Sequence, residues 1–385
     1  MPDLRVAIVG GGIGGLTLGC CLKQRGIPFE GVEITPVFAP VGAGIALGSN
    51  AMAVMRRLGL ADAVEARGKV LRNGIISNWR GSVLSDTDLG ALATHFGSMV
   101  AIHRSDLHDV LLGALGASSF RLDTTVESVR QAGDTLTLCW THGVEERFDL
   151  LVGADGIGSA VRETAVAPRE RIYSGYRCWR FCADIATDGW PGLNEMWGRG
   201  RRFGIVPIDP SRVYCFAVEN AARGTEDPEA GRAVRLREGF GGFAGAVPEI
   251  LERVADEDIH FADIDELAEG AWVNGRVALL GDAAHAMTPN MGQGAAMAIE
   301  DAWVLAERLA SAGSVSEALG SYESLRRPRV RLIQRRSRSL GRLAQVSARP
   351  LCAIRNLATR IVPTGAARKT FTSFLEASPV IAPGE

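Results

Sequence analysis

Short apolar runs that stop at glycine recur along this chain, and stretches of helical periodicity follow them. Residues 5–9 form the first such run, which ends at Gly10. Over residues 13–25 the apolar positions have helical spacing, and Gly26 ends that helix. A second apolar strand follows over residues 29–34. Strand, helix and strand in this order form a βαβ unit, which predicts a parallel sheet.

Two later runs repeat the pattern of a buried strand that enters a glycine. Residues 150–152 run into Gly153, and residues 277–280 run into Gly281. A long helix is predicted after the second run, over about residues 293–309. The chain is therefore expected to leave its first lobe and to return to it.

The intervening part is rich in strands and aromatic residues. Residues 135–140 alternate between polar and apolar side chains, which predicts an antiparallel strand. Residues 172–218 combine strand patterns with many aromatic side chains. We therefore predict an α/β fold, in which a Rossmann-like domain carries an inserted, mostly antiparallel β-sheet domain that forms the substrate lobe.

Serines mark the expected starts of several helices. Ser49 precedes one helical stretch and Ser105 opens another. Ser314 and Glu317 have the spacing of a capping box, which predicts a further helix. Pro328 lies inside this helix and is expected to break or kink it.

Composition and charge narrow the class of protein without indicating a macromolecular partner. Of the 385 residues, 46% are hydrophobic and 22% are charged, and the mean hydropathy is +0.09, so the chain can bury a large core. The 42 basic and 44 acidic residues give a formal net charge of -2, which provides no overall field for nucleic acid or a membrane. No stretch approaches the roughly 20 apolar residues of a membrane span.

The cysteines and one arginine-rich segment indicate neither a metal site nor a nucleic-acid partner. The seven cysteines form no CxxC pair and no metal-ligand spacing, so we expect reduced thiols in a cytoplasmic protein and no metal site. The arginines between Arg326 and Arg342 are interleaved with aliphatic residues, which predicts a helix with one packed and one solvated face. No aromatic residues alternate with these arginines for base stacking, so a nucleic-acid partner is not expected.

The first glycine motif is typical of dinucleotide binding. Gly10, Gly12 and Gly15 form G-x-G-x-x-G directly after a strand and at the start of a helix. In this fingerprint the glycines allow a tight turn, close approach of a pyrophosphate and close helix packing, and the helix N-terminus supplies partial positive charge. Glu33 ends the second strand, where it could accept from ribose hydroxyls; Glu30 is the nearer alternative, but strand alternation favours Glu33. The motif does not separate FAD from NAD.

Two further motifs resemble those of the flavoprotein aromatic hydroxylases, the p-hydroxybenzoate hydroxylase type. Residues 153–159, Gly-Ala-Asp-Gly-Ile-Gly-Ser, with Arg162, resemble the DG motif that lies near the pyrophosphate. Residues 281–294, Gly-Asp-Ala-Ala-His-Ala-Met-Thr-Pro-Asn-Met-Gly-Gln-Gly, resemble the GD segment and form the most specific motif in the chain. Smaller matches lie at residues 42–45 and 103–107. The chain resembles the compact salicylate and urate hydroxylase branch of this family.

The resemblance implies a role for each site residue. Asp282 would hydrogen-bond the ribityl chain, Pro289 would pack beside the flavin edge where oxygen adds, and residues 291–294 would place amides near the flavin N1 and C2 oxygen. Arg104 would reach the ribityl and phosphate region, whereas His285 is interpreted as structural. The expected cofactor-binding residues are Gly10, Gly12, Ile13, Gly14, Gly15, Glu33, Arg104, Asp155, Gly281, Asp282, Pro289, Met291, Gly292, Gln293 and Gly294.

The substrate site is predicted less narrowly. Pro289, Arg180 and Tyr214 are the expected catalytic residues, and Arg180 could pair with a carboxylate or phenolate or serve a structural role. No His, Asp or Glu of the β-rich lobe stands out as a general base. The candidate substrate contacts are Tyr176, Trp179, Arg180, Trp197, Arg202 and Tyr214.

The resemblance implies an FAD-dependent monooxygenase that hydroxylates a small aromatic or heteroaromatic substrate with O2. FAD would be tightly bound, and NADPH or NADH would bind transiently because no second fingerprint is present. Oxygen would add at flavin C4a, and the hydroperoxide would transfer one oxygen to a phenol, hydroxyquinoline or purine-like ring. Two alternatives stay open: a non-oxygenating FAD oxidoreductase, and a flavin-binding protein that protects an intermediate. A monomer or homodimer without integral membrane association is expected.

The expected domains are residues 1–171 for the first part of the FAD-binding domain, with small excursions, 172–270 for the β-rich substrate domain, 271–345 for the second part of the FAD-binding domain with its helix, and 346–385 for a C-terminal helical segment.

Overall fold

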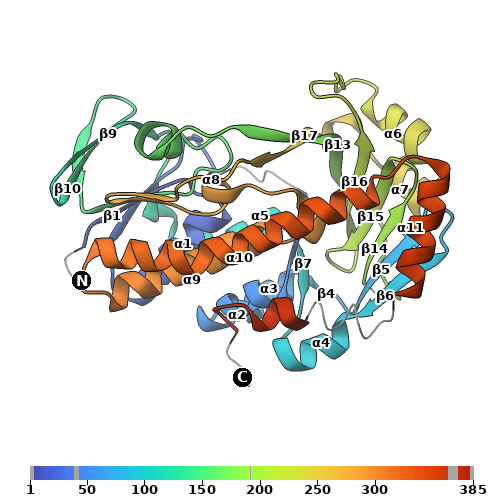
Figure 1. The fold of residues 1–385 in the computed structure, drawn as a ribbon, viewed down its shortest axis with the longest axis horizontal. Coiled ribbons are helices and arrows are strands. Elements are labelled where there is room, and N and C mark those ends of the chain that lie inside the picture. Colours follow the sequence, from blue (N-terminus) through green and yellow to red (C-terminus); the bar gives the residue numbers. More distant parts are fainter. Residues whose placement is uncertain (1–3, 39–42, 191, 363–371, 382–385) are drawn as a thin grey trace.

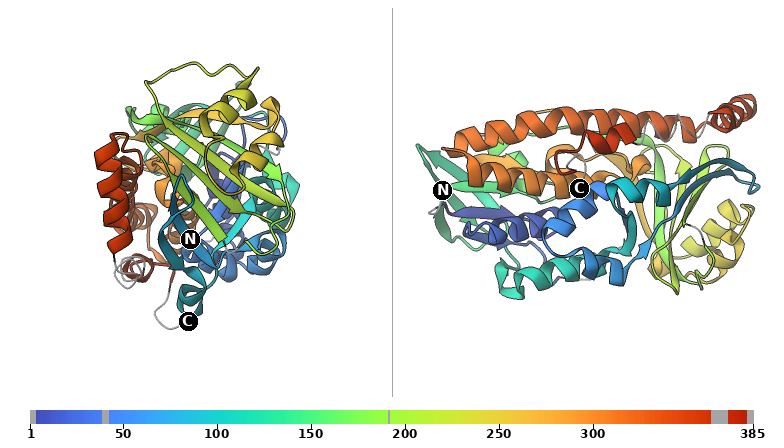
Figure 2. Two further views of the ribbon diagram at one scale, coloured as in Figure 1. Left: turned by 90° about the vertical axis from the view of Figure 1, so that its right-hand side faces the viewer. Right: turned by 90° about the horizontal axis from the view of Figure 1, so that it is seen from below.

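The computed structural model describes residues 4–38, 43–190, 192–362 and 372–381. The strands of these residues form four sheets, and the two largest organise two lobes along the long axis of the molecule (Figure 1). The long helix α10 (Val315–Ala344) runs across both lobes, as two further views also show (Figure 2).

The first lobe is built on a six-stranded sheet in the order β18-β19-β12-β1-β2-β8. Neighbouring strands from β19 to β8 are parallel, and β18 is antiparallel to β19. Every residue of β1 and β12 is buried, which explains why these strands read as continuous apolar runs. The strands are β1 (Val6–Val9), β2 (Phe29–Val32), β8 (Phe120–Arg121), β12 (Leu150–Gly153), β18 (Val273–Asn274) and β19 (Val277–Leu279).

Helices and a small sheet complete the core of this lobe. The helices α5 (Arg104–Leu115) and α9 (Gly294–Ser311) both pack against α1 (Ile13–Gln24). A three-stranded antiparallel sheet of β9 (Val126–Ala132), β10 (Thr135–Trp140) and β11 (Glu145–Phe148) contributes its alternate side chains to the same core. The antiparallel strand predicted over residues 135–140 is therefore confirmed.

The second lobe is built on a seven-stranded sheet in the order β17-β13-β16-β15-β14-β5-β6. Two of its strands, β5 (Asn73–Asn78) and β6 (Val83–Asp88), come from an early part of the chain. Helices α6 (Arg232–Phe240) and α7 (Val247–Glu252) cover one face of the sheet (Figure 1). The other strands are β13 (Arg171–Asp184), β14 (Gly192–Trp197), β15 (Arg201–Pro207), β16 (Arg212–Asn220) and β17 (His260–Leu267).

A second three-stranded sheet and short helices connect the lobes. They are β3 (Gly44–Leu47), β7 (Val100–His103) and β4 (Lys69–Val70), with α2 (Ser49–Arg57), α3 (Ala61–Arg67) and α4 (Leu89–Phe96). The N-cap of α2 is Gly48 and that of α5 is His103, so the serines predicted to precede these helices lie inside their first turns. The predicted cap of α10 is confirmed, because the Ser314 hydroxyl oxygen accepts from the Glu317 amide at 3.2 Å.

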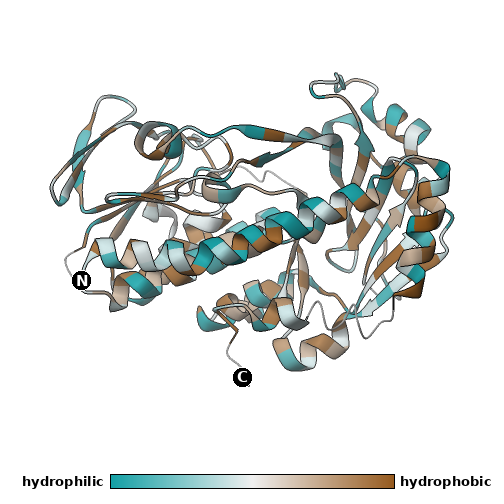
Figure 3. Ribbon diagram, in the orientation of Figure 1, coloured by the Kyte–Doolittle hydropathy of each residue, from teal (hydrophilic) through white to brown (hydrophobic). Residues whose placement is uncertain are grey.

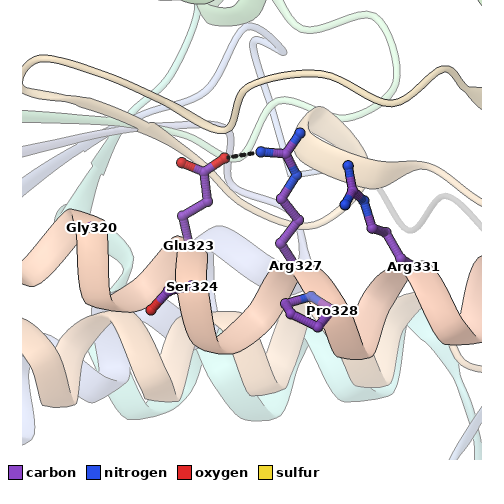
Figure 4. A pocket seen from close by; sticks show the side chains of 6 residues that line it. All are labelled: Gly320, Glu323, Ser324, Arg327, Pro328 and Arg331. Carbon is purple, nitrogen blue, oxygen red and sulfur yellow. Dashed lines mark hydrogen bonds and ion pairs between the residues drawn. The ribbon is translucent and has the colours of Figure 1, made fainter.

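The predicted break of the helix at Pro328 is wrong, whereas the alternative of a kink stays a prediction. Helix α10 continues from Val315 to Ala344 with Pro328 inside it. Pro328 has no backbone N–H, so the Ser324 carbonyl lacks its helical hydrogen bond. Both residues are exposed, so solvent can hydrogen-bond this carbonyl. The buried side chains of Arg326 and Arg329 hold the helix on either side of Pro328. Pro328 lines a pocket of about 290 Å3, and none of the lining residues, which Figure 4 labels, belongs to the glycine motifs.

Candidate functional site

The three glycine motifs lie together because the strands that lead into them are neighbours. β1, β12 and β19 are adjacent and parallel, so their carboxyl ends meet at one edge of the sheet. Gly10, Gly153 and Gly281 stand at or just after these three ends. Ligands of open α/β sheets bind outside the carboxyl ends of the strands, so this edge is the candidate site.

Two glycines of the first motif are required by close backbone contacts. Gly10 has φ +107°, and a Cβ there would lie 2.5 Å from the Ala154 carbonyl oxygen. A Cβ on Gly15 would lie 1.9 Å from the Gly10 carbonyl oxygen. By contrast, a Cβ on Gly12 would meet nothing within 4 Å, so the backbone there faces open space. The first loop is thus packed against the second motif and leaves room on its other side.

The structure separates the two acidic candidates at the end of β2. Glu33 Oε2 accepts from the Gly11 amide at 2.7 Å, so this carboxylate lies beside the glycine loop. Glu30 instead forms an exposed ion pair with Arg5 at 2.6 Å. His108 was not predicted from the sequence, yet its Nε2 lies 2.9 Å from the Gly11 carbonyl oxygen.

The second motif organises its own turn and also holds the third. Asp155 Oδ2 accepts from the Val161 amide at 3.1 Å, and desolvation raises the pKa of Asp155 although its hydrogen bond with Ser159 opposes the rise. The buried Arg162 donates to the carbonyls of Ile157, at 2.8 Å, and Ala283, at 3.1 Å. This arginine therefore fixes the third motif against the second.

Asp282 begins the short helix α8 (Asp282–His285) and keeps its side chain open to solvent. Desolvation by the surrounding protein nevertheless raises the pKa of its carboxyl group, and the charges of His285, Arg104 and Arg180 oppose that rise. Two of its charged neighbours, Arg104 and Arg180, come from different lobes, so Asp282 lies where the two lobes meet.

The loop after α8 ends at the N-terminus of α9. Pro289 is exposed at the start of a single 3-10 turn (Pro289–Met291), and Gly292 has φ +61°. A Cβ on Gly292 or on Gly294 would meet nothing within 4 Å, whereas Gln293 is buried and accepts from Asn50 Nδ2 at 3.2 Å. The first amides of α9 thus face free space with a positive helix end behind them.

A buried charge network supports this loop from behind. Asp301 Oδ2 accepts from the Gly281 amide at 3.0 Å and lies 2.6 Å from His285 Nε2. Burial would raise the pKa of Asp301, but His285 and Arg326 hold it at about 2. Arg326 also pairs with Glu300, and all four of these side chains are buried. His285 is thus part of the support of the loop.

The alternation of β13 and its neighbours decides which predicted substrate residues face this site. Trp179 packs with Phe240 of α6 and donates from Nε1 to Asp227, so it lies on the far face of the sheet and the expectation for Trp179 is wrong. Arg180 and Tyr214 lie on the opposite face, in the registers Arg180 with Phe216 and Cys182 with Tyr214. Burial raises the pKa of the Tyr214 hydroxyl well above its usual range.

Asn290 joins the loop to the sheet and was not singled out from the sequence. Its Nδ2 donates to the Tyr176 hydroxyl and to the Ser337 carbonyl, each at 2.9 Å. Its Oδ1 accepts from Arg202, whose guanidinium is buried and paired with Glu195 at 3.0 Å. Tyr176 and Arg202 therefore position the loop. Trp197, another predicted contact, is buried and donates to Glu195.

An apolar wall adjoins Tyr214 on this face. Tyr214 and Phe216 pack at a ring separation of 6.0 Å and lie against a cluster of buried aliphatic side chains. Within the part of the chain that the structure describes, Arg180 has neither an ion pair nor a hydrogen bond. Beside Tyr214, the partly exposed side chains of Cys182, Leu193 and Phe216 thus form an apolar wall on this face, next to the Tyr214 phenol and the unpaired Arg180. The cluster consists of Leu71, Leu89, Leu92, Ala101, Val206 and Ile208.

These residues fit an FAD molecule. The open backbone at Gly12 and Gly292, the accessible carboxylate of Asp282 and the N-termini of α1 and α9 provide donors, acceptors and free space along one edge. Arg104 is exposed at the start of α5. Of the smaller predicted matches, Gly42 lies outside the described residues.

Comparisons with known proteins agree with this geometry. Residues 3–337 match the family described as FAD binding domain. The chain is 39% identical to the aurachin C monooxygenase/isomerase of Stigmatella aurantiaca, over 93% of this chain and 94% of that protein. It is 33% identical to the 2-heptyl-3-hydroxy-4(1H)-quinolone synthase of Pseudomonas aeruginosa, over 95% and 96%. Klebsiella pneumoniae HpxO, solved with FAD and uric acid, matches with a TM-score of 0.91 at 26% identity over 98% of each chain.

The chain therefore belongs to the FAD binding domain family. It is an FAD-dependent monooxygenase, and the predicted fold class, an FAD-binding domain with an additional antiparallel sheet, is confirmed.

Proposed function

We propose that this monooxygenase uses O2 and NADPH or NADH to hydroxylate a flat quinolone-type heteroaromatic ring that carries an apolar substituent. The observation that supports the proposal is the composition of the site face, where an apolar wall adjoins a single unpaired arginine and a tyrosine. Such a face suits a ring with one polar edge and an apolar remainder. Two relatives with similar length are named for aurachin C and for a heptyl quinolone.

Arg180 and Tyr214 are proposed to bind the polar edge of the ring. Tyr214 is protonated at neutral pH, and burial raises the pKa of its hydroxyl group further, so it can donate to a ring oxygen. Arg180 can stabilise the deprotonated form of the same oxygen, whose negative charge is delocalised onto the ring carbon that is hydroxylated. The apolar wall beside Tyr214 would bind the substituent.

The cofactor would be held by the residues that the resemblance indicates. Glu33 would accept from the ribose hydroxyls, residues 10–15 with the N-terminus of α1 would bind the pyrophosphate, and Asp282 would bind the ribityl chain. When bound, FAD accepts electrons from the nicotinamide and supplies the oxygenating chemistry. Pro289 would exclude water at the edge of the flavin, and the first amides of α9 would stabilise negative charge there.

A ring with a carboxylate is the second candidate, because Arg180 has no anionic partner among the described residues. The 3-amino-4-hydroxybenzoate 2-monooxygenase PtnB3 of Streptomyces platensis is 38% identical over 88% of this chain. In that case Arg180 would pair with the carboxylate.

The test is a substrate panel with the FAD-reconstituted enzyme. A 4-quinolone with a long alkyl chain, the same ring with a methyl group, 3-amino-4-hydroxybenzoate and urate are compared for stimulated NADPH or NADH oxidation, with product mass checked for one added oxygen. The proposal expects the long-chain quinolone to give the highest kcat/KM. Preference for 3-amino-4-hydroxybenzoate supports the second candidate, and consumption without an oxygenated product from any ring contradicts both.

A further inference from the structure

Helix α11 (Arg349–Ile361) presents an apolar face to solvent at one end of the molecule (Figures 1 and 3). Its outward side chains are large and aliphatic, and their spacing places them on one side of the helix. Solvent-exposed fractions of this size are unusual for four neighbouring aliphatic side chains. These exposures are 54% for Leu351, 63% for Ile354, 61% for Leu357 and 69% for Ile361.

The opposite side of α11 is fixed to the body of the protein. Arg355 is buried, donates to the Ala344 carbonyl at 2.9 Å and to the Gly198 carbonyl at 3.0 Å, and stacks over the Trp197 ring at 5.3 Å. Cys352 is buried beside it. The inner face thus has its partners in this chain, and the outer apolar face is presented by a helix that is held in place.

The chain segment that carries this face is basic, although β6, which packs against α11, adds the exposed Asp86 and Asp88. The chain contains no aspartate or glutamate between Glu323 and Glu376, whereas arginines recur throughout this segment. Arg342, Arg349 and Arg360 are exposed, and none of them forms an ion pair within the described part of the chain. The overall net charge of -2 therefore includes a strongly basic segment between Glu323 and Glu376.

We propose that the outer face of α11 docks on a lipid bilayer that contains anionic phospholipid. An amphipathic helix with aliphatic residues on one side and arginines at its polar edge lies in the plane of a membrane interface, with its apolar face about 5–10 Å into the boundary region. The exposed arginines would pair with lipid phosphates, each contributing most close to an anionic surface. Among the described residues, no helix is long and apolar enough to cross a bilayer, so the contact would be peripheral.

Charge complementarity favours this occupant over a second copy of the chain. Two copies that met through α11 would bring Arg349 and Arg360 close to the same residues of the other copy, with no acidic residue in the segment to balance them. An anionic bilayer can bury the outer aliphatic side chains of α11 and pair its phosphates with the arginines. This inference does not depend on the identity of the ring that the enzyme hydroxylates.

Vesicle flotation of the FAD-loaded full chain tests the proposal. We expect the protein to float with vesicles of phosphatidylglycerol and phosphatidylcholine, less with pure phosphatidylcholine, and less again at high salt. The double variant Ile354→Ser/Leu357→Ser should lose roughly tenfold or more of the binding, because it removes exposed apolar surface from the docked face. Arg349→Gln/Arg360→Gln should lower binding only to the anionic vesicles.

A matched control is Val144→Ser. Val144 is 48% exposed before β11, in the other lobe, and its replacement should leave flotation unchanged. Unchanged flavin content in every variant shows that the fold is intact. Absence of wild-type flotation with phosphatidylglycerol, or equal flotation of the Ile354→Ser/Leu357→Ser variant, overturns the proposal. A dimer in light scattering that the same variant dissociates, without vesicle binding, assigns the face to a second copy instead.

Discussion

Asn290 Nδ2 donates to the Tyr176 hydroxyl at 2.9 Å, which ties the loop after Pro289 to strand β13. This contact joins the cofactor side of the site to the substrate sheet, so the position of the loop depends on the sheet.

Replacing Tyr176 by Phe should therefore loosen the loop. We expect the free energy of unfolding to fall by about 0.5–1.5 kcal/mol, the contribution of one hydrogen bond. We also expect less hydroxylated product per NAD(P)H consumed, because a loop that moves admits water. Urea denaturation and the ratio of product to hydrogen peroxide measure the two effects. Tyr173→Phe is the control, since it loses a similar bond to the Ala221 carbonyl, at 2.8 Å; an equal loss of coupling in both variants would contradict the role of Asn290.

Asp282→Ala should weaken FAD binding. Hydrogen bonds to a charged group contribute about 1.5–3 kcal/mol, so the dissociation constant for FAD should rise by about tenfold or more. Asp282→Asn, which keeps an acceptor, should lose less. Flavin absorbance after gel filtration and fluorescence titration measure the change. The exposed Asp62 of α3 supplies the control Asp62→Ala, and flavin retention equal to that of the control would disprove the ribityl assignment.

Glu33 and Glu30 should behave differently although they lie three positions apart. Glu33→Ala removes the carboxylate beside Gly11 and should lower FAD affinity. Glu30→Ala removes only an exposed ion pair with Arg5, which contributes about 0–1 kcal/mol to stability, and should leave FAD affinity unchanged. Titration of both apoproteins with FAD measures the difference. Loss of affinity in Glu30→Ala alone would reverse the assignment.

Arg180→Gln should raise KM for the substrate by about tenfold to a hundredfold, because it removes a charged hydrogen-bond donor. Steady-state kinetics with the preferred ring of the panel measures this, and Arg180→Lys should recover part of the loss. Arg201→Gln is the matched control: Arg201 lies on β15 and stacks over Phe240 on the far face of the sheet. A KM that is unchanged in Arg180→Gln would remove Arg180 from the substrate site.

The sequence was sufficient for features that depend on neighbouring residues. Gly10 to Glu33 and Gly281 to Gly294 are local motifs, and the strands that carry them follow from continuous apolar runs. That the motifs meet was implied by the family resemblance, and the strand order β19-β12-β1 that brings them together is seen only in the structure.

Features that depend on tertiary packing could not be predicted. The direction of Trp179 requires the register of β13, because a shift of one residue exchanges the two faces of a strand. The contact of Arg202 with Asn290 joins residues far apart in the chain. The continuity of α10 through Pro328 depends on buried anchors such as Arg326, which pairs with Glu300 and Asp301 of another helix.

The ionisation of Asp301 should make the stability of the protein depend on pH, because this carboxylate belongs to the buried charge network behind the loop. Its pKa is about 2 in the folded protein against an ordinary value of 3.8. A carboxyl group with a lowered pKa stabilises the folded state above its ordinary pKa, and this contribution is lost as the pH falls toward the folded value. The difference between the two pKa values corresponds to a contribution of about 2 kcal/mol to the free energy of unfolding. About 1 kcal/mol of this contribution is lost when the pH has fallen to about pH 3.

Asp301→Asn should therefore lower the free energy of unfolding most at neutral pH. It leaves His285 without its buried anionic partner and Arg326 with Glu300 alone, which is expected to lower the free energy of unfolding by about 3–5 kcal/mol. The difference from the wild type should shrink by about 1 kcal/mol between about pH 7 and about pH 3, because the wild type loses the ionised form there. Urea denaturation across this range measures it, with Asp62→Asn as an exposed control. A difference that stays constant over the whole range would show that the ionisation of Asp301 does not stabilise the loop.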